Sequence, residues 1–527
     1  MNKVALSIAS FLIVAGCAAA KTGSLVPAAT PTGLSTNAST VGKSAAYPVV
    51  NVMKDCGAWG DGKTNDSAAF QKAADLINKA GGGTLVIPKA VYIVGQQEHE
   101  AGKSRYYQSR DVFALSNVKF LLIDGHGATL RLEPGLRYGS FDKETGQIYT
   151  PKMPFYDPDY IADVKSMISV TKSENVTIRN LELDGNSGKL LLGGLWGDVG
   201  RQLGGSGIFL YNNCCVQISK VNSHHQALDG IMIGWTGLKA TGAPTPHTLT
   251  DCSFEYNGRQ GLSWVGGRGL KAVRCKFNHT QRSMNNGAPI GSSPGAGVDI
   301  EAEDSVDRDG DFQDCEFMDN GGAGVVADSG DGGYSHFARC TFWGTTYWSA
   351  WNGKPGLKYQ DCNFYGAAVH TVGSPDPHLA TGFLRCHFED KPWTNGKVYR
   401  EGGSSGGFLL DTDDGGDNVS FDTCSFIANA NKSIWFGAGK GLFNNCTFLH
   451  KWAGAPDNDF QALIHVATLS GCHFTEEFPA DTKKNWFIAL GRTVTTKENP
   501  TVVDGPHIHW AGPGGPIGEI KPGSYNS

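Results

Sequence analysis

Among the acidic residues of the sequence, Asp299 and Glu301 have the types and the spacing that best suit acid–base catalysis. They alternate with the apolar residues Val298 and Ile300, as expected of a β-strand with one buried face. The two carboxyl groups are then predicted side by side on the outer face, about 6.6 Å apart along the strand. Crowded carboxylates raise one another's pKa, and glycoside cleavage needs a protonated acid beside an ionised base. The pair therefore predicts acid–base cleavage of a glycosidic bond, and its spacing favours inversion of configuration.

Asp328 is a third acidic candidate. It follows Gly324 at the same spacing at which Glu301 follows Gly297. On neighbouring parallel strands the two carboxylates would lie about 4.8 Å apart, so Asp328 is expected to modulate or replace one member of the pair. The alternatives are a solvated acidic surface and a Ca²⁺ site built from hard oxygen ligands. No cofactor is required by the acid–base prediction.

Arg259 and Gln260 stand just before Gly261. Arg259 is expected on the outer face, where it could orient a sugar hydroxyl or carboxylate. In a lyase it could instead neutralise the substrate or abstract its proton. A surface arginine in a turn is the alternative. Gln260 is predicted to bind substrate.

Asp229 and His225 precede these residues in the chain. Asp229 is interpreted either as a turn residue or as an acid–base partner of Asp299 on another coil. His225 belongs to a pair with His224 and is interpreted either as a loop residue or as a contact to substrate. No metal ligand is predicted.

Two long loops, at 135–162 and 188–205, contain several aromatic residues. Aromatic rings over a groove suit stacking on sugar rings, and the same rings could instead pack on the flank of the fold. Tyr149, Trp196 and Arg201 are the substrate contacts predicted from these loops.

The elements that must position these residues repeat along the chain. Nine of the 13 cysteines lie in the pattern Cys-x-Phe, mostly 22 to 26 residues apart. The cysteines are Cys252, Cys275, Cys315, Cys340, Cys362, Cys386, Cys424, Cys446 and Cys472, and each phenylalanine lies two residues later. Residues two apart on a strand face the same side, and a unit of this length in a β-rich chain is typical of a solenoid. The repeat predicts interior ladders of unpaired Cys and of Phe, because the odd count argues against systematic disulfides. Zinc is not predicted, because the chain has no CxxC pair.

A second strand repeats in the same units. Apolar residues occupy the first and third positions after five glycines, at Gly207, Gly230, Gly261, Gly297 and Gly324. The intervening positions, which include Asp299 and Glu301, are therefore predicted to face outward. Each coil should contain at least two short parallel strands, which indicates an all-β parallel solenoid.

Composition agrees with this fold class. Of 527 residues, 71 are Gly, and charged residues make up only 18%. The net charge of −6 provides no basic excess for nucleic-acid binding. A polyanionic polysaccharide would therefore have to be bound by local clusters of Arg and Lys.

The N-terminus is predicted to be a targeting segment. An apolar stretch at 4–15 is too short to cross a bilayer, and the small residues before Cys17 resemble a bacterial lipobox. Cys17 is therefore expected to be lipidated, with an ordinary signal peptide as the alternative. The protein is expected in the bacterial cell envelope, lipid-anchored, or else secreted.

A capping helix is predicted at 67–79, with Asp66 as its N-cap. The surrounding segment, 55–94, resembles the opening of the pectate-lyase-like, right-handed parallel β-helix superfamily. The marks of this resemblance are Gly57-Ala58, Gly60-Asp61-Gly62, Asp66, Gly81-Gly82-Gly83 and Pro88 with Tyr92. The resemblance implies a carbohydrate-active protein, commonly a glycoside hydrolase, polysaccharide lyase or epimerase.

Three functions follow as hypotheses. The first is a polysaccharide-degrading glycoside hydrolase, the second a Ca²⁺-assisted lyase acting on a uronate, and the third a non-catalytic glycan-binding solenoid. The expected partners are a polysaccharide and, through the lipid, a membrane. The expected organisation is a signal peptide at 1–17, a tether at 18–46, the β-helix at 47–480 and an irregular segment at 481–527.

Overall fold

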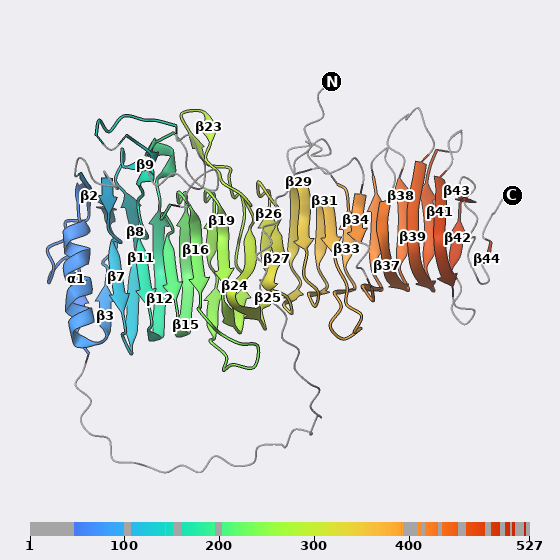
Figure 1. The fold of residues 1–527 in the computed structure, drawn as a ribbon, viewed down its shortest axis with the longest axis horizontal. Helices are drawn as coiled ribbons and strands as arrows, with labels where there is room; N and C mark the ends of the chain where they lie inside the picture. Colours follow the sequence, from blue (N-terminus) through green and yellow to red (C-terminus); the bar gives the residue numbers. More distant parts are fainter. Residues whose placement is uncertain are drawn as a thin grey trace, which may run out of the picture. The chain divides into compact units, whose positions relative to one another are not determined.

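The computed structural model is built from parallel strands that repeat coil after coil (Figure 1). It describes residues 47–99, 107–142, 144–150, 160–194, 203–391, 393, 408–412, 417–429, 435–451, 460–479, 486–495, 501–505, 508–511 and 521–522. Each coil contributes strands to three parallel sheets, which agrees with the prediction of at least two strands in each coil.

The first sheet carries the candidate site. It contains β7 (Phe113–Ser116), β11 (Ile168–Thr171), β14 (Ile208–Tyr211), β16 (Asp229–Gly234), β19 (Gln260–Val265), β24 (Val298–Arg308), β27 (Val325–Asp331), β34 (Phe408–Thr412) and β43 (Ile508–Ala511), with parts of β29 (Thr341–Asn352), β31 (Asn363–Thr371), β37 (Trp435–Asn444), β39 (Phe460–Ser470) and β41 (Trp486–Thr495).

The second sheet follows the first in each coil. It contains β1 (Val49–Asn51), β3 (Gly83–Val86), β17 (His247–Thr250), β21 (Leu270–Val273), β25 (Asp311–Gln313), β28 (His336–Ala338), β30 (Lys358–Gln360), β32 (Gly382–Leu384) and β35 (Ser420–Asp422), with parts of β8 (Leu121–Leu132), β12 (Glu174–Asp184), β15 (Cys214–His224), β37, β39 and β41.

The third sheet completes the coil. It contains β2 (Asp61–Asn65), β4 (Val91–Val94), β18 (Ser253–Glu255), β26 (Glu316–Met318), β33 (His387–Glu389), β36 (Ser425–Ala428), β38 (Thr447–Lys451), β40 (His473–Glu477), β42 (Val502–Asp504) and β44 (Lys521–Pro522), with parts of β8, β12, β15, β29 and β31.

Smaller elements lie outside these three sheets. They are β5 (Gln97–His99), β6 (Tyr107–Ser109), β9 (Arg137–Ser140), β10 (Tyr160–Ala162) and β13 (Leu191–Leu192) in one sheet, the hairpin of β22 (Met284–Asn285) and β23 (Ala288–Pro289), β20 (Gly267–Arg268) beside the end of β24, and a 3-10 turn at Ser187–Lys189.

The interior ladders predicted from Cys-x-Phe are confirmed. All nine cysteines are buried and none forms a disulfide. The nine phenylalanines stack ring on ring, with neighbouring centroids 4.3 to 5.6 Å apart. A second ladder, of Phe312, Phe337, Tyr359, Phe383, Phe421 and Phe443, lies in the second sheet at 4.7 to 4.9 Å. This aromatic stacking stabilises the contact between coils in addition to the apolar area that each coil buries against the next.

Helix α1 (Ser67–Ala80) lies beside β3 and β7 at the N-terminal end (Figure 1). It buries Phe70 and Ile77 against the first strands, as expected of a cap. Asp66 does not cap it through its side chain. Its carboxylate instead accepts hydrogen bonds from the backbone N–H groups of Trp59 and Gly60, at 2.6 and 3.0 Å. No helix in the described part of the chain is long and apolar enough to cross a membrane.

The C-terminal prediction of an irregular segment at 481–527 is wrong. Strands β41 to β44 continue the parallel sheets beyond residue 480. Val503 pairs with Phe474, and Thr501, two residues earlier, is buried. The pattern Thr-x-Val replaces Cys-x-Phe in this coil. The coils therefore continue beyond the last Cys-x-Phe repeat of the sequence.

Candidate active site

One row of side chains runs along the outer face of the first sheet. Residues in register on successive strands are Phe209, Met232, Ser263, Asp299, Val326, Trp351 and His370. The predicted alternation is confirmed, because Val298 and Ile300 on either side of Asp299 are fully buried in the core. Asp299 therefore lies between Ser263 and Val326, with Phe209 and Met232 further along the row on one side and Trp351 and His370 on the other.

Asp299 is only 4% exposed. Gln260 Nε2, on the preceding coil, donates a hydrogen bond to its Oδ2 at 2.6 Å. Burial raises the pKa of Asp299 well above its usual range, and the nearby carboxylates of Glu301 and Asp328 raise it further, while Arg259 opposes the shift. The raised pKa favours the protonated carboxyl group, which is the state that a general acid needs.

Gln260 is fully buried, and both ends of its amide are occupied. Its Oε1 accepts a hydrogen bond from the backbone N–H of Ala296 at 3.1 Å, while its Nε2 binds Asp299. These contacts leave the predicted binding of substrate by Gln260 without support, and we interpret Gln260 as a residue that orients Asp299.

Arg259 and Asp229 form a buried, two-pronged ion pair. Arg259 Nε and Nη2 donate to Asp229 Oδ1 and Oδ2 at 2.9 and 2.7 Å. The Asp229 side chain is 1% exposed and that of Arg259 is 11% exposed. Both oxygens of Asp229 bind the guanidinium, which argues against the predicted acid–base role of Asp229. A paired guanidinium does not release its proton, so the predicted use of Arg259 as a lyase base is also replaced by an electrostatic role.

The turn that presents Arg259 and Gln260 is held by Asn257 and by a column of glycines. Asn257 Oδ1 accepts the backbone N–H of Gln226 at 3.0 Å, and Asn257 is fully buried. A Cβ at Gly261 would lie 2.5 Å from the carbonyl oxygen of Gly297 on the next coil. The close approach of these backbones explains why the first sheet begins with glycine on successive coils.

Glu301 is half-buried and lies two residues from Asp299 on β24. Asp328 is exposed, and it is not opposite Glu301 as predicted. Ile300 pairs with Ala327 and Glu301 pairs with Ser329, so a β-bulge leaves Asp328 as the extra residue. The Ca²⁺ alternative stays a prediction, although the raised pKa of Asp299 makes its carboxyl group a weaker ligand for a hard cation.

An aromatic cluster beside the acids was not identified from the sequence. Trp351 stacks on His370 with centroids 3.9 Å apart, and Trp348 lies 5.0 Å from Trp351. His370 Nδ1 lies 3.2 Å from Asp411 Oδ2. The register could have located this cluster, because Ser349 takes the place of glycine in the coil after Gly324 and Trp351 follows it by two residues.

A pocket of about 300 Å³ lies further along the same row, on the coils that precede Asp299. Its lining includes Phe209, Met232, Arg259 and Lys165. Lys165 Nζ lies 2.9 Å from Asp163 Oδ2, so both cations of this lining are already paired with carboxylates. The pocket and the tryptophans together flank Asp299 along one row of the sheet.

The family comparison covers this row. A family model described as the right-handed β-helix region matches residues 166–375, which carry every described member of the acidic site. This chain is a right-handed parallel β-helix protein. The fold implied by the resemblance at 55–94 is thereby confirmed.

Individual proteins resemble this β-helix over short lengths or at low identity. Alginate lyase 7 of Azotobacter vinelandii is 55% identical over 42 residues, which are 8% of this chain and 5% of that protein. The chain thus spans a small part of this curated relative.

Solved structures with a similar course of the chain include three from different sources. The bacteriophage phi29 gene product 12 is 12% identical, and the match covers 89% of this chain and 57% of that chain with a TM-score of 0.45. The mannuronan C-5 epimerase AlgE4 A-module of Azotobacter vinelandii is 15% identical, and the match covers 88% of this chain and 100% of that chain with a TM-score of 0.41. An exopolygalacturonase of Thermotoga maritima is 13% identical, and the match covers 88% of this chain and 91% of that chain with a TM-score of 0.29. These values are too low to support an argument about function.

The remaining predicted contacts lie elsewhere in the β-helix or outside its described residues. His225 lies in the turn after β15, where its ring contacts His224 and Tyr256 rather than the Asp299 cluster. Tyr149 is half-buried in the loop after β9, and its backbone N–H donates to Ser140 at 3.4 Å. Trp196, Arg201 and the predicted lipidation site Cys17 lie outside the described residues.

Proposed function

We propose that this β-helix protein is a glycoside hydrolase that cleaves a polysaccharide lying along the outer face of its first sheet. The observation that carries the proposal is the buried, hydrogen-bonded carboxyl group of Asp299 two residues from the more exposed Glu301. Two carboxyl groups with environments that separate their pKa values are the arrangement that glycoside hydrolysis uses.

In the proposed reaction, Asp299 donates its proton to the glycosidic oxygen as the bond from that oxygen to the anomeric carbon breaks. Glu301 takes a proton from a water molecule, whose oxygen bonds to the anomeric carbon. A spacing of about 6.6 Å along the strand leaves room for that water and favours inversion. The products are a new reducing end and a new hydroxyl group.

Trp351 and Trp348 are proposed to bind a sugar ring next to the bond that breaks. They lie two coils from Asp299, about 10 Å away at the usual strand spacing. Their rings present apolar surface to the pyranose, and Arg259 on the other side can donate to a hydroxyl group.

Β-Elimination by a lyase receives less support. Arg259, the predicted proton-abstracting group, is held in its ion pair with Asp229. Both cations of the adjoining pocket are paired, so the described lining offers no excess positive charge for a uronate. We further propose that the protein acts outside the cytoplasm, anchored through a lipid on Cys17.

The test is incubation of the purified protein with a panel of neutral and acidic polysaccharides. Reducing ends and the ultraviolet absorbance of unsaturated sugars are followed together. The proposal predicts reducing ends without absorbance. A parallel rise in absorbance would contradict hydrolysis and establish a lyase, and glycan binding without product would favour a non-catalytic solenoid.

A further inference from the structure

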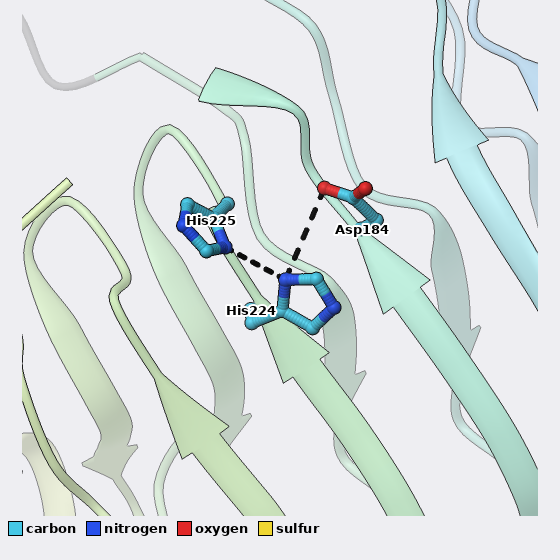
Figure 2. Close-up of side chains that lie close together, drawn as sticks. All are labelled: Asp184, His224 and His225. Atoms are coloured by element: carbon cyan, nitrogen blue, oxygen red, sulfur yellow. Dashed lines mark hydrogen bonds and ion pairs between the residues drawn. The ribbon is translucent and has the colours of Figure 1, made fainter. Parts of the chain in front are cut away.

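A second polar cluster lies away from the acidic site, where β12 and β15 end on neighbouring coils of the third sheet. Figure 2 shows Asp184 at the end of β12, and His224 and His225 at the end of β15 and in the turn after it. One oxygen or nitrogen atom from each side chain lies within 4.8 Å of the others. All three side chains are partly buried, and none lines the pocket beside Arg259.

Glu182 fixes the proton on His224. His224 Nε2 lies 3.0 Å from Glu182 Oε1, so this nitrogen donates its hydrogen to the carboxylate. In the neutral ring, Nδ1 then carries a lone pair. That Nδ1 faces His225 Nδ1 at 2.7 Å and Asp184 Oδ1 at 3.9 Å (Figure 2). A carboxylate behind a histidine is the usual arrangement around a metal-binding imidazole.

The other two side chains are also held in place. The ring of His225 stacks on Tyr256 with centroids 5.3 Å apart and planes within 8°. Asp184 Oδ2 accepts Arg131 Nε at 2.7 Å, and Asp184 Oδ1 accepts the backbone N–H of Asn186 at 2.8 Å. Because a carboxylate oxygen has a second lone pair, Oδ1 retains a position for a further ligand.

We infer that Asp184, His224 and His225 bind a divalent transition metal ion of the Zn²⁺ type. Two imidazole nitrogens and one carboxylate oxygen are a known zinc ligand set, in which a fourth position is left for water. Zn–N and Zn–O bonds of about 2.0–2.2 Å place tetrahedral ligands about 3.3 Å apart. The spacings of 2.7 and 3.9 Å bracket that value, so small side-chain rotations complete the site.

The nitrogen ligands decide the class of metal. Ca²⁺ and Mg²⁺ prefer oxygen ligands, whereas imidazole suits Zn²⁺, Ni²⁺ and Cu²⁺. The ion would join the coil of β12 to that of β15. The sequence-based exclusion of zinc considered only thiolate pairs, and it therefore overlooked a site built from adjacent histidines and a carboxylate on the preceding coil.

The test is calorimetric titration of the full chain, without a histidine-containing affinity tag, with Zn²⁺, and visible spectroscopy with Co²⁺ as the probe. The wild type should bind one ion, and His224→Ala and His225→Ala should each abolish binding. Glu182→Gln should weaken it about 10- to 100-fold. His279→Ala is the matched control, because His279 belongs to the same aromatic stack and lies outside the cluster. It should bind as the wild type does.

Zn²⁺ should also raise the melting temperature of the wild type and leave that of His224→Ala unchanged. Circular dichroism before titration shows whether each variant is folded. Absence of Zn²⁺ binding to the wild type would overturn the inference, as would equal binding by folded His224→Ala and His225→Ala variants.

Discussion

Gln260 Nε2 donates a 2.6 Å hydrogen bond to Asp299 Oδ2 on the next coil, and neither residue is more than 4% exposed. Since Oδ2 accepts this bond, Oδ1 is the oxygen that would carry the proton in the proposed reaction. It links the acid to the turn that also holds Arg259, so the orientation of Asp299 depends on residues about 40 positions earlier in the chain.

Replacing Gln260 by Ala should shift the pH dependence of activity. A hydrogen bond to the carboxylate favours its ionised form, so its loss raises the pKa of Asp299 further. A bond to a charged group contributes about 1.5–3 kcal/mol, which corresponds to about one to two pH units. The alkaline limb of the kcat profile should move upward by that amount, with a lower maximum. An unchanged limb would show that Gln260 does not act through Asp299.

Replacing Asp299 by Asn should stabilise the protein at alkaline pH. The folded pKa of Asp299 is raised, so the folded state binds more protons than the unfolded state between the two pKa values, and stability falls as pH rises through that window. The loss is about 1.4 kcal/mol per pH unit above an unfolded pKa of about 3.9. Urea denaturation at pH 4 and pH 8 should show a gain for the variant that grows with pH. A gain that shrinks with pH would contradict the raised pKa.

Replacing Arg259 by Leu should destabilise the fold strongly, because it leaves the buried carboxylate of Asp229 without its partner. Loss of one member of a buried pair costs about 3–5 kcal/mol. The double variant Arg259→Leu with Asp229→Leu should recover most of this free energy. Denaturation midpoints of the wild type, both single variants and the double variant measure the coupling. Additive losses would show that the two side chains do not stabilise one another.

Replacing Trp351 by Ala should weaken substrate binding. An aromatic contact contributes about 0.5–1.5 kcal/mol, so KM should rise up to about tenfold while kcat changes less. Trp343→Ala is the matched control, because Trp343 belongs to an aromatic group on the third sheet. Equal effects of the two substitutions would argue against a sugar site at Trp351.

The repeat of Cys-x-Phe predicted the fold because each mark occupies the same inward position on successive coils. The same alternation predicted that Asp299 faces outward. Where other residues fill the repeated positions, the pattern gives no signal. Ser349 replaces the repeated glycine in the coil that carries Trp351, so the glycine pattern does not identify that coil. Thr501 and Val503 replace Cys and Phe near the C-terminus, so the Cys-x-Phe pattern does not identify the last coils.

Three features of the sites depend on backbone geometry that the spacing of residues in the sequence does not reveal. The bulge at Asp328 shifts the register by one residue, and parity alone does not show it. Parity also does not show that the turn brings Arg259 onto Asp229. The cluster of Asp184 with His224 combines residues 40 positions apart, because one coil inserts a long loop between them.

The measurement that tests the central claim most directly compares the wild type, Asp299→Asn and Asp307→Asn on a polysaccharide that the wild type cleaves. Asp307 lies on the same strand, is fully buried, and its pKa is likewise raised well above the usual range by burial. It is therefore a matched control for a buried acid outside the outer row. Reducing-end release should fall about 10²- to 10⁴-fold in Asp299→Asn and stay near the wild-type rate in Asp307→Asn. Wild-type rates in a folded Asp299→Asn variant would contradict the assignment of Asp299 as the general acid.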